Sequence, residues 1–289
     1  MNKQRATAIG FAAVLLWALL AVLTVGTAPT PPLLLNTICF TIGGICGLIW
    51  SALSGGLGML RTVPLRVYIF GTLGLFGYHA LYFSALRMAP AAEAGLIAYL
   101  WPLLIVLFSG LLPGENLRPG HVIGAFIGLA GAALIISGGG GGFQAEHAAG
   151  YALALACALI WSGYSVLSRV MGDTPTQSVS VFCLGSAALS LPLHLMFEPT
   201  ILPQSPTGWV AILVLGLGPV GLAFFVWDIG MKRGDIQILG AASYAAPLLS
   251  TCVLVFAGVA PMSASLGIAA ILVTAGALVA ARASLGRSR

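Results

Sequence analysis

The stretch that decides the fold is ATAIGFAAVLLWALLAVLTVG, residues 6–26, in which 21 consecutive residues carry no charged side chain. As a helix this run is about 30 Å long, which matches the hydrocarbon core of a bilayer. It follows Lys3 and Arg5 as in a signal peptide, but the apolar part of a signal peptide spans only about 7 to 15 residues. We therefore interpret residues 6–26 as a membrane-spanning helix.

The rest of the chain continues in the same way. Of its 289 residues 59% are hydrophobic and 7% are charged, with a mean hydropathy of +1.05, whereas a soluble domain carries about 25% charged residues. This composition excludes a soluble domain, a disordered chain and a nucleic-acid binder, despite the net charge of +5. The runs are continuously apolar, which favours helices over barrel strands. Ten spans are expected: 6–26, 33–53, 66–87, 91–112, 119–137, 148–168, 177–197, 208–228, 236–257 and 262–281.

The loop charges predict the orientation of these spans. With a cytoplasmic N-terminus, ten spans leave only Arg87 of the twelve Lys and Arg residues outside. Positive charge is retained on the cytoplasmic side of inner-membrane proteins, so both termini are expected in the cytoplasm. The residues predicted inside are Lys3, Arg5, Arg61, Arg66, Arg118, Arg169, Lys232, Arg233, Arg282, Arg287 and Arg289.

The chain repeats itself at half its length. Trp17 and Trp161 are 144 residues apart, and the segments YLWP (99–102) and YAAP (244–247) are 145 apart. LGL at 73–75 likewise returns at 215–217, with an offset of 142. Because five spans are an odd number, the second half must enter the membrane from the opposite side. We predict an all-helical membrane protein of two inverted repeats, 1–138 and 148–289, joined by an external glycine-rich linker, 139–147.

Two inverted halves around a central site can exchange inward-open and outward-open shapes, so the arrangement favours a carrier. Several motifs add a family resemblance: Gly114-Glu115-x-Leu117, Gly124, Gly131-Ala-Ala-Leu134, and the tandem tryptophans Trp17 and Trp161. With these motifs the sequence resembles the EamA-type carriers of the drug/metabolite transporter superfamily, although the second half has Ala260-Pro261 in place of Gly-Glu. The resemblance implies a ten-helix exporter of the bacterial inner membrane, with aromatic amino acids among its substrates. It also implies a central cavity lined chiefly by helices 1, 3, 4, 6, 8 and 9.

Aromatic and polar residues inside the spans outline a candidate binding site. Polar groups at this depth are costly unless they face the bundle interior or a wet cavity, and these aromatics lie too deep for an interfacial belt. His79, the only titratable residue near the centre of a span, is a candidate for substrate contact or proton coupling. The predicted substrate-binding residues are Trp17, Tyr78, His79, Tyr82, Tyr99, Trp101, Trp161, Tyr164, Ser243 and Tyr244.

Other residues are expected to have structural roles. Pro102 and Pro247 each remove a backbone donor at equivalent places and are predicted hinges or fixed bends. Gly124 and Gly128 form a small-residue motif. We assign it to helix packing within the chain in preference to a dimer interface. Asp228 is expected to pair with Lys232 one turn later, and Asp235 to begin a helix. Glu93 and His194 are assigned to a helix start and to the membrane boundary.

The missing charges narrow the substrate. No Lys or Arg lies deep in a span, which disfavours phosphorylated cargo, and no carboxylate lies near the centre of one, which disfavours lipophilic cations. A zwitterionic amino acid remains, with a multidrug or other neutral-metabolite exporter as the alternative. An intramembrane enzyme using Ser165 is a remote alternative, because the histidines are scattered, and a channel or scaffold is another. We expect no cofactor and no metal, since the five cysteines lie in apolar runs without ligand spacing, and a monomer rather than a dimer.

Overall fold

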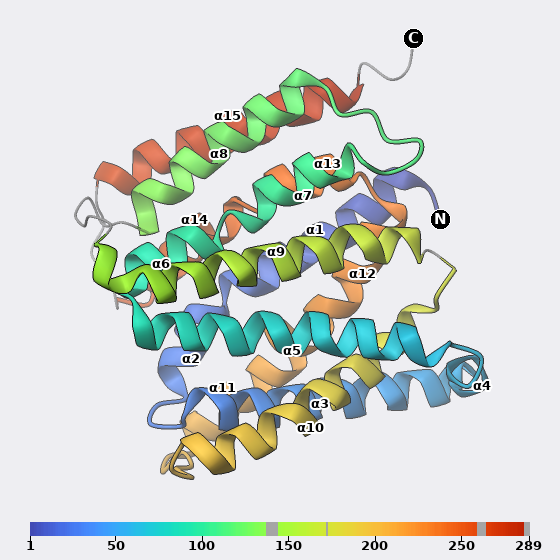
Figure 1. The fold of residues 1–289 in the computed structure, drawn as a ribbon, viewed down its shortest axis with the longest axis vertical. Coiled ribbons are helices and arrows are strands. Elements are labelled where there is room, and N and C mark those ends of the chain that lie inside the picture. Colours follow the sequence, from blue (N-terminus) through green and yellow to red (C-terminus); the bar gives the residue numbers. More distant parts are fainter. Residues whose placement is uncertain (137–143, 172, 259–263, 286–289) are drawn as a thin grey trace.

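The computed structural model describes residues 1–136, 144–171, 173–258 and 264–285, and in these ranges it is built of helices without strands (Figure 1). The glycine run at 138–142, which we expect to join the halves, lies outside the described residues. The helices of the first half are α1 Lys3–Ala18, α2 Leu20–Gly26, α3 Pro32–Leu53, α4 Leu57–Leu60, α5 Leu65–Met88, α6 Ala91–Ala98, α7 Trp101–Ser109 and α8 Pro119–Ile136. The second half has η1 Ala145–His147, α9 Ala148–Val170, η2 Thr176–Ser178, α10 Val179–Phe197, α11 Pro206–Leu217, the π-helix η3 Gly218–Leu222, α12 Ala223–Arg233, α13 Ile236–Ala242, α14 Ala245–Phe256 and α15 Ala264–Leu285.

The helices agree closely with the expected spans. Within the described residues, nine helical segments are long and apolar enough to cross a membrane. The fourth expected span, 91–112, is instead a shorter apolar segment, Glu93–Ser109. This segment is divided between α6 and α7, and neither piece crosses a bilayer alone.

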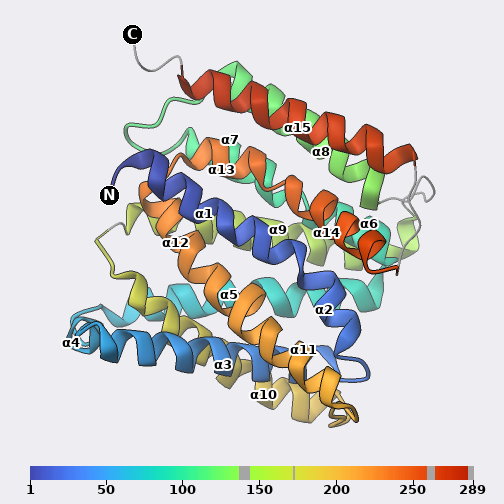
Figure 2. The same ribbon diagram turned by 180° about the vertical axis from the view of Figure 1, so that it is seen from behind.

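The helices lie side by side with their axes roughly aligned (Figures 1 and 2). α8 packs along α15 at one edge, α3 packs on α10 at the opposite edge, and α1, α9, α7 and α13 lie between them. The start of α1 and the end of α15 lie at one end of the bundle, which we call the termini end (Figure 1). At the other end α8 finishes and α9 begins, and we call it the junction end.

Glycines set the close approach of α8 to α15. A Cβ atom on Gly276 would lie 2.5 Å from the carbonyl oxygen of Gly124 and 2.8 Å from the amide nitrogen of Gly128. Both contacts are to backbone, which cannot move aside as a flexible side chain can. The motif at Gly124 and Gly128 therefore serves packing within the chain, as expected.

Four spanning segments in the described part of the chain are interrupted near mid-length. α1 gives way to α2 at Leu19, and α6 to α7 at residues 99–100. α11 and α12 are separated by the five-residue π-helix, and α13 gives way to α14 at residues 243–244. Pro102 and Pro247 each come directly after one of these breaks, near the start of the new helix, where the missing N–H matters least. Whether they also act as hinges stays a prediction.

One hydrogen bond joins the two proline breaks across the bundle. In a continuous helix the amide of Leu103 would donate to the carbonyl of Tyr99. It donates instead to the hydroxyl of Tyr244, at 3.1 Å, and Tyr244 is fully buried. A side chain from the break in the second half thus satisfies a backbone donor at the break in the first half.

We predict that Gly276→Val lowers the thermal stability of the purified protein, because its side chain would push α8 and α15 apart. Overpacking of this kind costs about 1–3 kcal/mol, and the midpoint of thermal unfolding in detergent measures it. Gly267→Val is the matched control on the same helix, since a Cβ at Gly267 meets nothing within 4 Å. Equal midpoints for the two variants would contradict the backbone contact.

Tyr244→Phe is predicted to be destabilising although it removes only one oxygen atom. It leaves the buried amide of Leu103 without its acceptor, at a cost of about 1–3 kcal/mol. The equivalent change Tyr99→Phe should leave the unfolding midpoint close to that of the parent, because Tyr99 lines a cavity. A larger loss of stability in Tyr99→Phe than in Tyr244→Phe would contradict this assignment.

Candidate functional site

A cavity of about 350 Å³ lies where the broken helices meet. A volume of this size suits a small ligand. Its walls come from both halves of the chain and include seven of the ten predicted binding residues: Trp17, Tyr78, His79, Tyr82, Tyr99, Trp101 and Trp161. The rest of the lining is Leu20, Ala21, Ala98, Ile135, Ile136, Pro219, Val220, Phe224, Ala246, Pro247, Ser250, Thr251 and Leu254.

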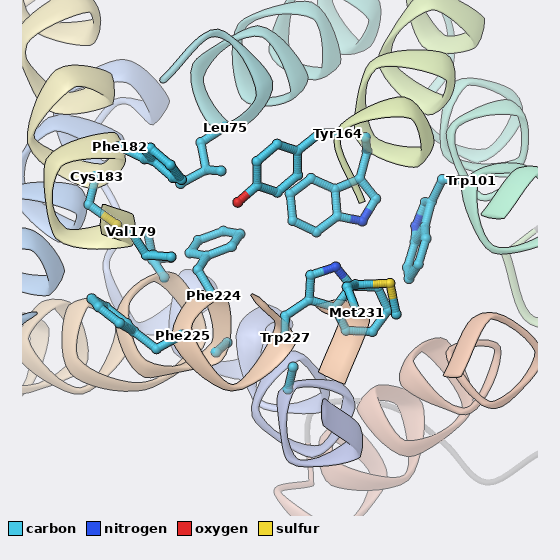
Figure 3. Packing of buried hydrophobic residues seen from close by; sticks show 14 of the residues in the cluster. Leu75, Trp101, Tyr164, Val179, Phe182, Cys183, Phe224, Phe225, Trp227 and Met231 are labelled. Carbon is cyan, nitrogen blue, oxygen red and sulfur yellow. The ribbon is translucent and has the colours of Figure 1, made fainter. Parts of the chain in front are cut away.

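Indole rings close the cavity toward the termini end. The ring of Trp17 packs edge-on against Trp101 and Trp161, with centroids 6.0 and 5.8 Å apart, and its Nε1 donates to the carbonyl of Pro219 at 3.2 Å. Trp227 lies beneath, with its centroid 5.1 Å from that of Trp17. Figure 3 shows Trp101 and Trp227 next to the fully buried Met231. These edge contacts fix the rings in one arrangement.

The α5 wall carries two tyrosines and the histidine of the site. Tyr78 and Tyr82, one turn apart, stack with centroids 6.1 Å apart and an interplanar angle of 10°. The Nδ1 atom of His79 lies 2.7 Å from the carbonyl oxygen of Leu75. A carbonyl can only accept, so Nδ1 carries a proton, and in the neutral ring Nε2 is then an acceptor. The partner of Nδ1 is thus a backbone carbonyl and not a side-chain hydroxyl.

Tyr164, Ser243 and Tyr244 were predicted with the other seven but are absent from the cavity lining. Tyr164 stacks on Phe70 beneath the cavity, where Figure 3 shows its ring among the buried core. The hydroxyl of Ser243 donates to the carbonyl of Leu239 at 2.7 Å, and Tyr244 bonds to the Leu103 amide. The hydroxyls of Ser243 and Tyr244 are therefore bonded within the fold, and the ring of Tyr164 packs in the core.

Other lining residues were not predicted from the sequence. Phe224 is apolar, so nothing in its local sequence separates it from ordinary core, yet its ring lies 5.7 Å from that of Trp161. Ser250 and Thr251 line the cavity from α14. Their signal was their place one turn after Pro247, on a helix already assigned to the site.

Among the described lining residues no side chain carries a formal charge at neutral pH. The nearby ionic groups pair outside the cavity. Asp228 bonds to Lys232 at 2.9 Å, as expected, and Asp235 accepts from the amide of Ile238 at the start of α13. Burial would raise the pKa of Asp235, but the Lys3 ammonium 2.8 Å away and the helix amide lower it overall. In the described ranges no three His, Cys, Asp or Glu residues are grouped to hold a metal ion.

The sequence assigned His194 to the membrane boundary and indicated no bonding partner for it. The structure gives it two. Its side chain is buried at the junction end, with Nδ1 3.1 Å from Glu198 and Nε2 2.9 Å from Thr200. Glu198 also accepts from the first amides of α3 and pairs with Arg87 at 2.8 Å. This cluster fastens α3, α5 and α10 together. It was missed because its members are far apart in sequence.

Comparison with known proteins identifies the architecture. The model of the EamA-like transporter family matches the chain twice, at residues 4–137 and 148–282. The chain is 54% identical to the aromatic amino acid exporter YddG of Ancylobacter novellus over 283 residues, 97% of this chain and 98% of that protein. The proteins of the same name from Salmonella typhimurium and Escherichia coli are 28% and 26% identical, each over 96% of this chain and 97% of the relative.

A solved crystal structure superimposes with a TM-score of 0.92 at 54% identity, covering 96% of this chain and 98% of that one. The apolar helices and these relatives describe a multi-pass protein of the bacterial inner membrane, a transporter rather than an enzyme. The double match also agrees with the repeat found in the sequence. This chain belongs to the EamA-like transporter family.

Proposed function

We propose that this protein exports amino acids, aromatic and other apolar ones among them, from the cytoplasm by alternating access. The observation that carries the proposal is the cavity itself: six Trp and Tyr rings and one imidazole enclose about 350 Å³ with no formally charged side chain in the described lining. The relatives named as aromatic amino acid exporters support the same substrate class.

An uncharged cavity selects a cargo whose own charges nearly cancel. A phosphorylated metabolite would lose its hydration with no cation to replace it, and a lipophilic cation would find no carboxylate. A zwitterionic amino acid brings one positive and one negative group close together, so the field to be compensated is small. The aromatic walls then contact its apolar side chain.

The helix breaks supply groups for the two charged ends of such a substrate. α7 and α14 begin at the cavity, and the positive end of a helix favours a carboxylate. Ala98 also lines the cavity, and Pro102, four residues later, has no N–H to donate to its carbonyl. This carbonyl and the Nε2 acceptor of His79 favour the α-ammonium group.

We further propose ten membrane crossings with both termini in the cytoplasm. α6 and α7 together form the fourth crossing. The start of α1 and the end of α15 lie at the same end of the bundle, which supports an even number (Figure 1). Arg87 lies at the junction end, whereas Lys3 and Arg169 lie at the termini end, in agreement with retention of positive charge inside. The halves 1–138 and 148–289 then have opposite topology.

In this orientation the structure represents an outward-open shape. The lining runs from the tryptophan floor through residues of α2, α14 and the end of α8, all on the junction side of the helix breaks. Rocking of the two halves around the floor would expose the same rings to the cytoplasm. Pro102 and Pro247, which follow matching breaks, are the proposed hinges.

The alternatives receive less support from the site. A multidrug exporter would also have aromatic walls. Amino-acid export and multidrug export are distinguished by whether amino acids are transported. For an intramembrane serine enzyme, Ser165 would need a base, but its hydroxyl accepts from Trp227 at 3.0 Å and is fully buried. The transport reading explains the cavity without an additional group.

We predict saturable uptake of tryptophan and phenylalanine by liposomes that contain the purified protein. The uptake should accelerate when the lumen is preloaded with unlabelled substrate, because a carrier exchanges and a channel does not. Labelled glutamate and lysine should move far more slowly, since their net charge is unmatched in the cavity. Comparing flux with and without a pH gradient tests proton coupling. Transport of an organic dye without any amino acid would favour the multidrug alternative.

Alanine substitution in the α5 wall is predicted to reduce transport and leave folding intact. Tyr82→Ala should lower transport efficiency about tenfold, the equivalent of about 1.4 kcal/mol of lost ring contact, and Tyr78→Ala combined with it should abolish measurable flux. Trp209→Ala is the matched control, because Trp209 is 45% exposed on the outer surface of α11. Normal flux in the double variant, at equal membrane insertion, would refute the proposed site.

A further inference from the structure

Opening the cavity toward the termini end requires two packed helices to separate there. The internal repeat identifies these helices. The open cavity is bordered by Leu20 and Ala21 of α2 and by Ser250, Thr251 and Leu254 of α14. Offsets of 144 and 145 residues convert these positions to Tyr164 and Ser165 of α9 and to Ile105, Val106 and Ser109 of α7. In an inverted repeat the second shape exchanges the roles of the two sets.

In this structure the second set is packed shut. Ser165, Ile105, Val106 and Ser109 are fully buried, and Tyr164 is 4% exposed. α7 and α9 lie in contact along this line. We call this contact line the α7/α9 seam, and we call the cavity border formed by α2 and α14 the open mouth. By the internal repeat, the seam is the closed counterpart of the open mouth.

A partly buried ion pair crosses the end of this seam, with the Arg169 side chain 19% exposed. Arg169, in the last turn of α9, donates through Nη2 to Glu115, in the loop after α7, at 2.5 Å. Through Nη1 it donates to the carbonyls of Met231 and Gly234 at 2.8 and 2.9 Å. These carbonyls end α12, where a cation is favoured. α12 thus positions the guanidinium, and Glu115 completes the bridge, with its side chain 6% exposed.

The open mouth has no equivalent pair in its sequence. The position 144 residues before Arg169 is Val25. Gly114 and Gly258 both have positive φ, 79° and 72°, and so mark the same turn in the two halves, but Gly258 is followed by Val259 and Ala260 rather than by glutamate. The Arg87 and Glu198 pair at the junction end joins α5 to α10, and α10 contributes nothing to the described lining.

We propose that Arg169 and Glu115 form a one-sided latch that holds the termini-end mouth closed and biases the resting carrier toward the junction-open shape. Opening the α7/α9 seam separates the two residues and exposes a desolvated pair, whereas closing the other mouth breaks no matching bond. The inference rests on the proposed alternating access but does not depend on which substrate is carried.

The latch is tested by labelling a cysteine inside the seam. Ser109→Cys is introduced with Cys46→Ala and Cys252→Ala, which remove the two native cysteines that are not buried. The protein is placed in lipid nanodiscs, where both faces are accessible, and treated with a charged maleimide without substrate. The same background without Ser109→Cys measures residual labelling.

Glu115→Gln, which keeps the size of the side chain, and Arg169→Gln should each raise the labelling rate about tenfold, the shift produced by about 1.4 kcal/mol of lost closure. The double variant should be no faster than the faster single variant, because the two residues make one bond. If Arg169→Gln fails to fold, Glu115→Gln alone decides the question.

Lys3→Gln is the matched control. It removes an ion pair of 2.8 Å at the same end, to Asp235, but this pair joins α1 to α13. Their counterparts α9 and α6 stay packed beside the open mouth, where Ala154 and Ala94 share a buried cluster. Labelling of Glu115→Gln at the parent rate, or equal acceleration by Lys3→Gln, would overturn the latch. Fast labelling in a protein without amino acid flux would keep the latch and refute the exporter.

Discussion

The structure depends on one constraint: inside a bilayer no water is present to satisfy a broken helix. Four spanning helices in the described residues are nevertheless interrupted, and their interruptions gather around one cavity. Grouping lowers the free-energy cost of the breaks, because backbone groups exposed at one break can bond to another break or face the cavity. The bond from Leu103 to the Tyr244 hydroxyl shows the first case, and Ala98, which lines the cavity and whose carbonyl has no N–H donor at Pro102, agrees with the second.

The repeat supplies matching breaks, but the side chains at matching positions have different roles. Tyr99 and Tyr244 follow the same helix segment in the two halves, yet Tyr99 lines the cavity and Tyr244 closes the break opposite. Trp17 and Trp161, by contrast, meet face to edge on the floor. An exact twofold site would bind both orientations of an amino acid equally. These differences give the cavity one wall with phenol and imidazole groups and another in which Ser250 and Thr251 stand among apolar residues.

The sequence predicts the spans well because charge is excluded from hydrocarbon, so each helix end is visible from composition alone. It also predicts that the two halves repeat each other, and it names most of the aromatic residues that line the cavity, since Trp17, Tyr78 and Trp161 lie deep in spans. Rotation about each helix axis is harder to predict, which is why Tyr164 and Tyr244 were placed in the cavity and Phe224 was not. The pairing of Arg169 with Glu115 joins residues 54 positions apart, and no local pattern connects them.

The absence of charge from the cavity and its presence at the termini-end mouth are connected. A charged binding site would hold its counter-ion in both shapes and would slow release, whereas rings and hydroxyls bind a zwitterion weakly enough to exchange it. The free energy that keeps one side of the carrier closed must then come from groups outside the binding site, which the substrate does not contact. The proposed latch of Arg169 and Glu115 meets this condition, because the two residues bond to each other and neither is among the described lining residues of the cavity.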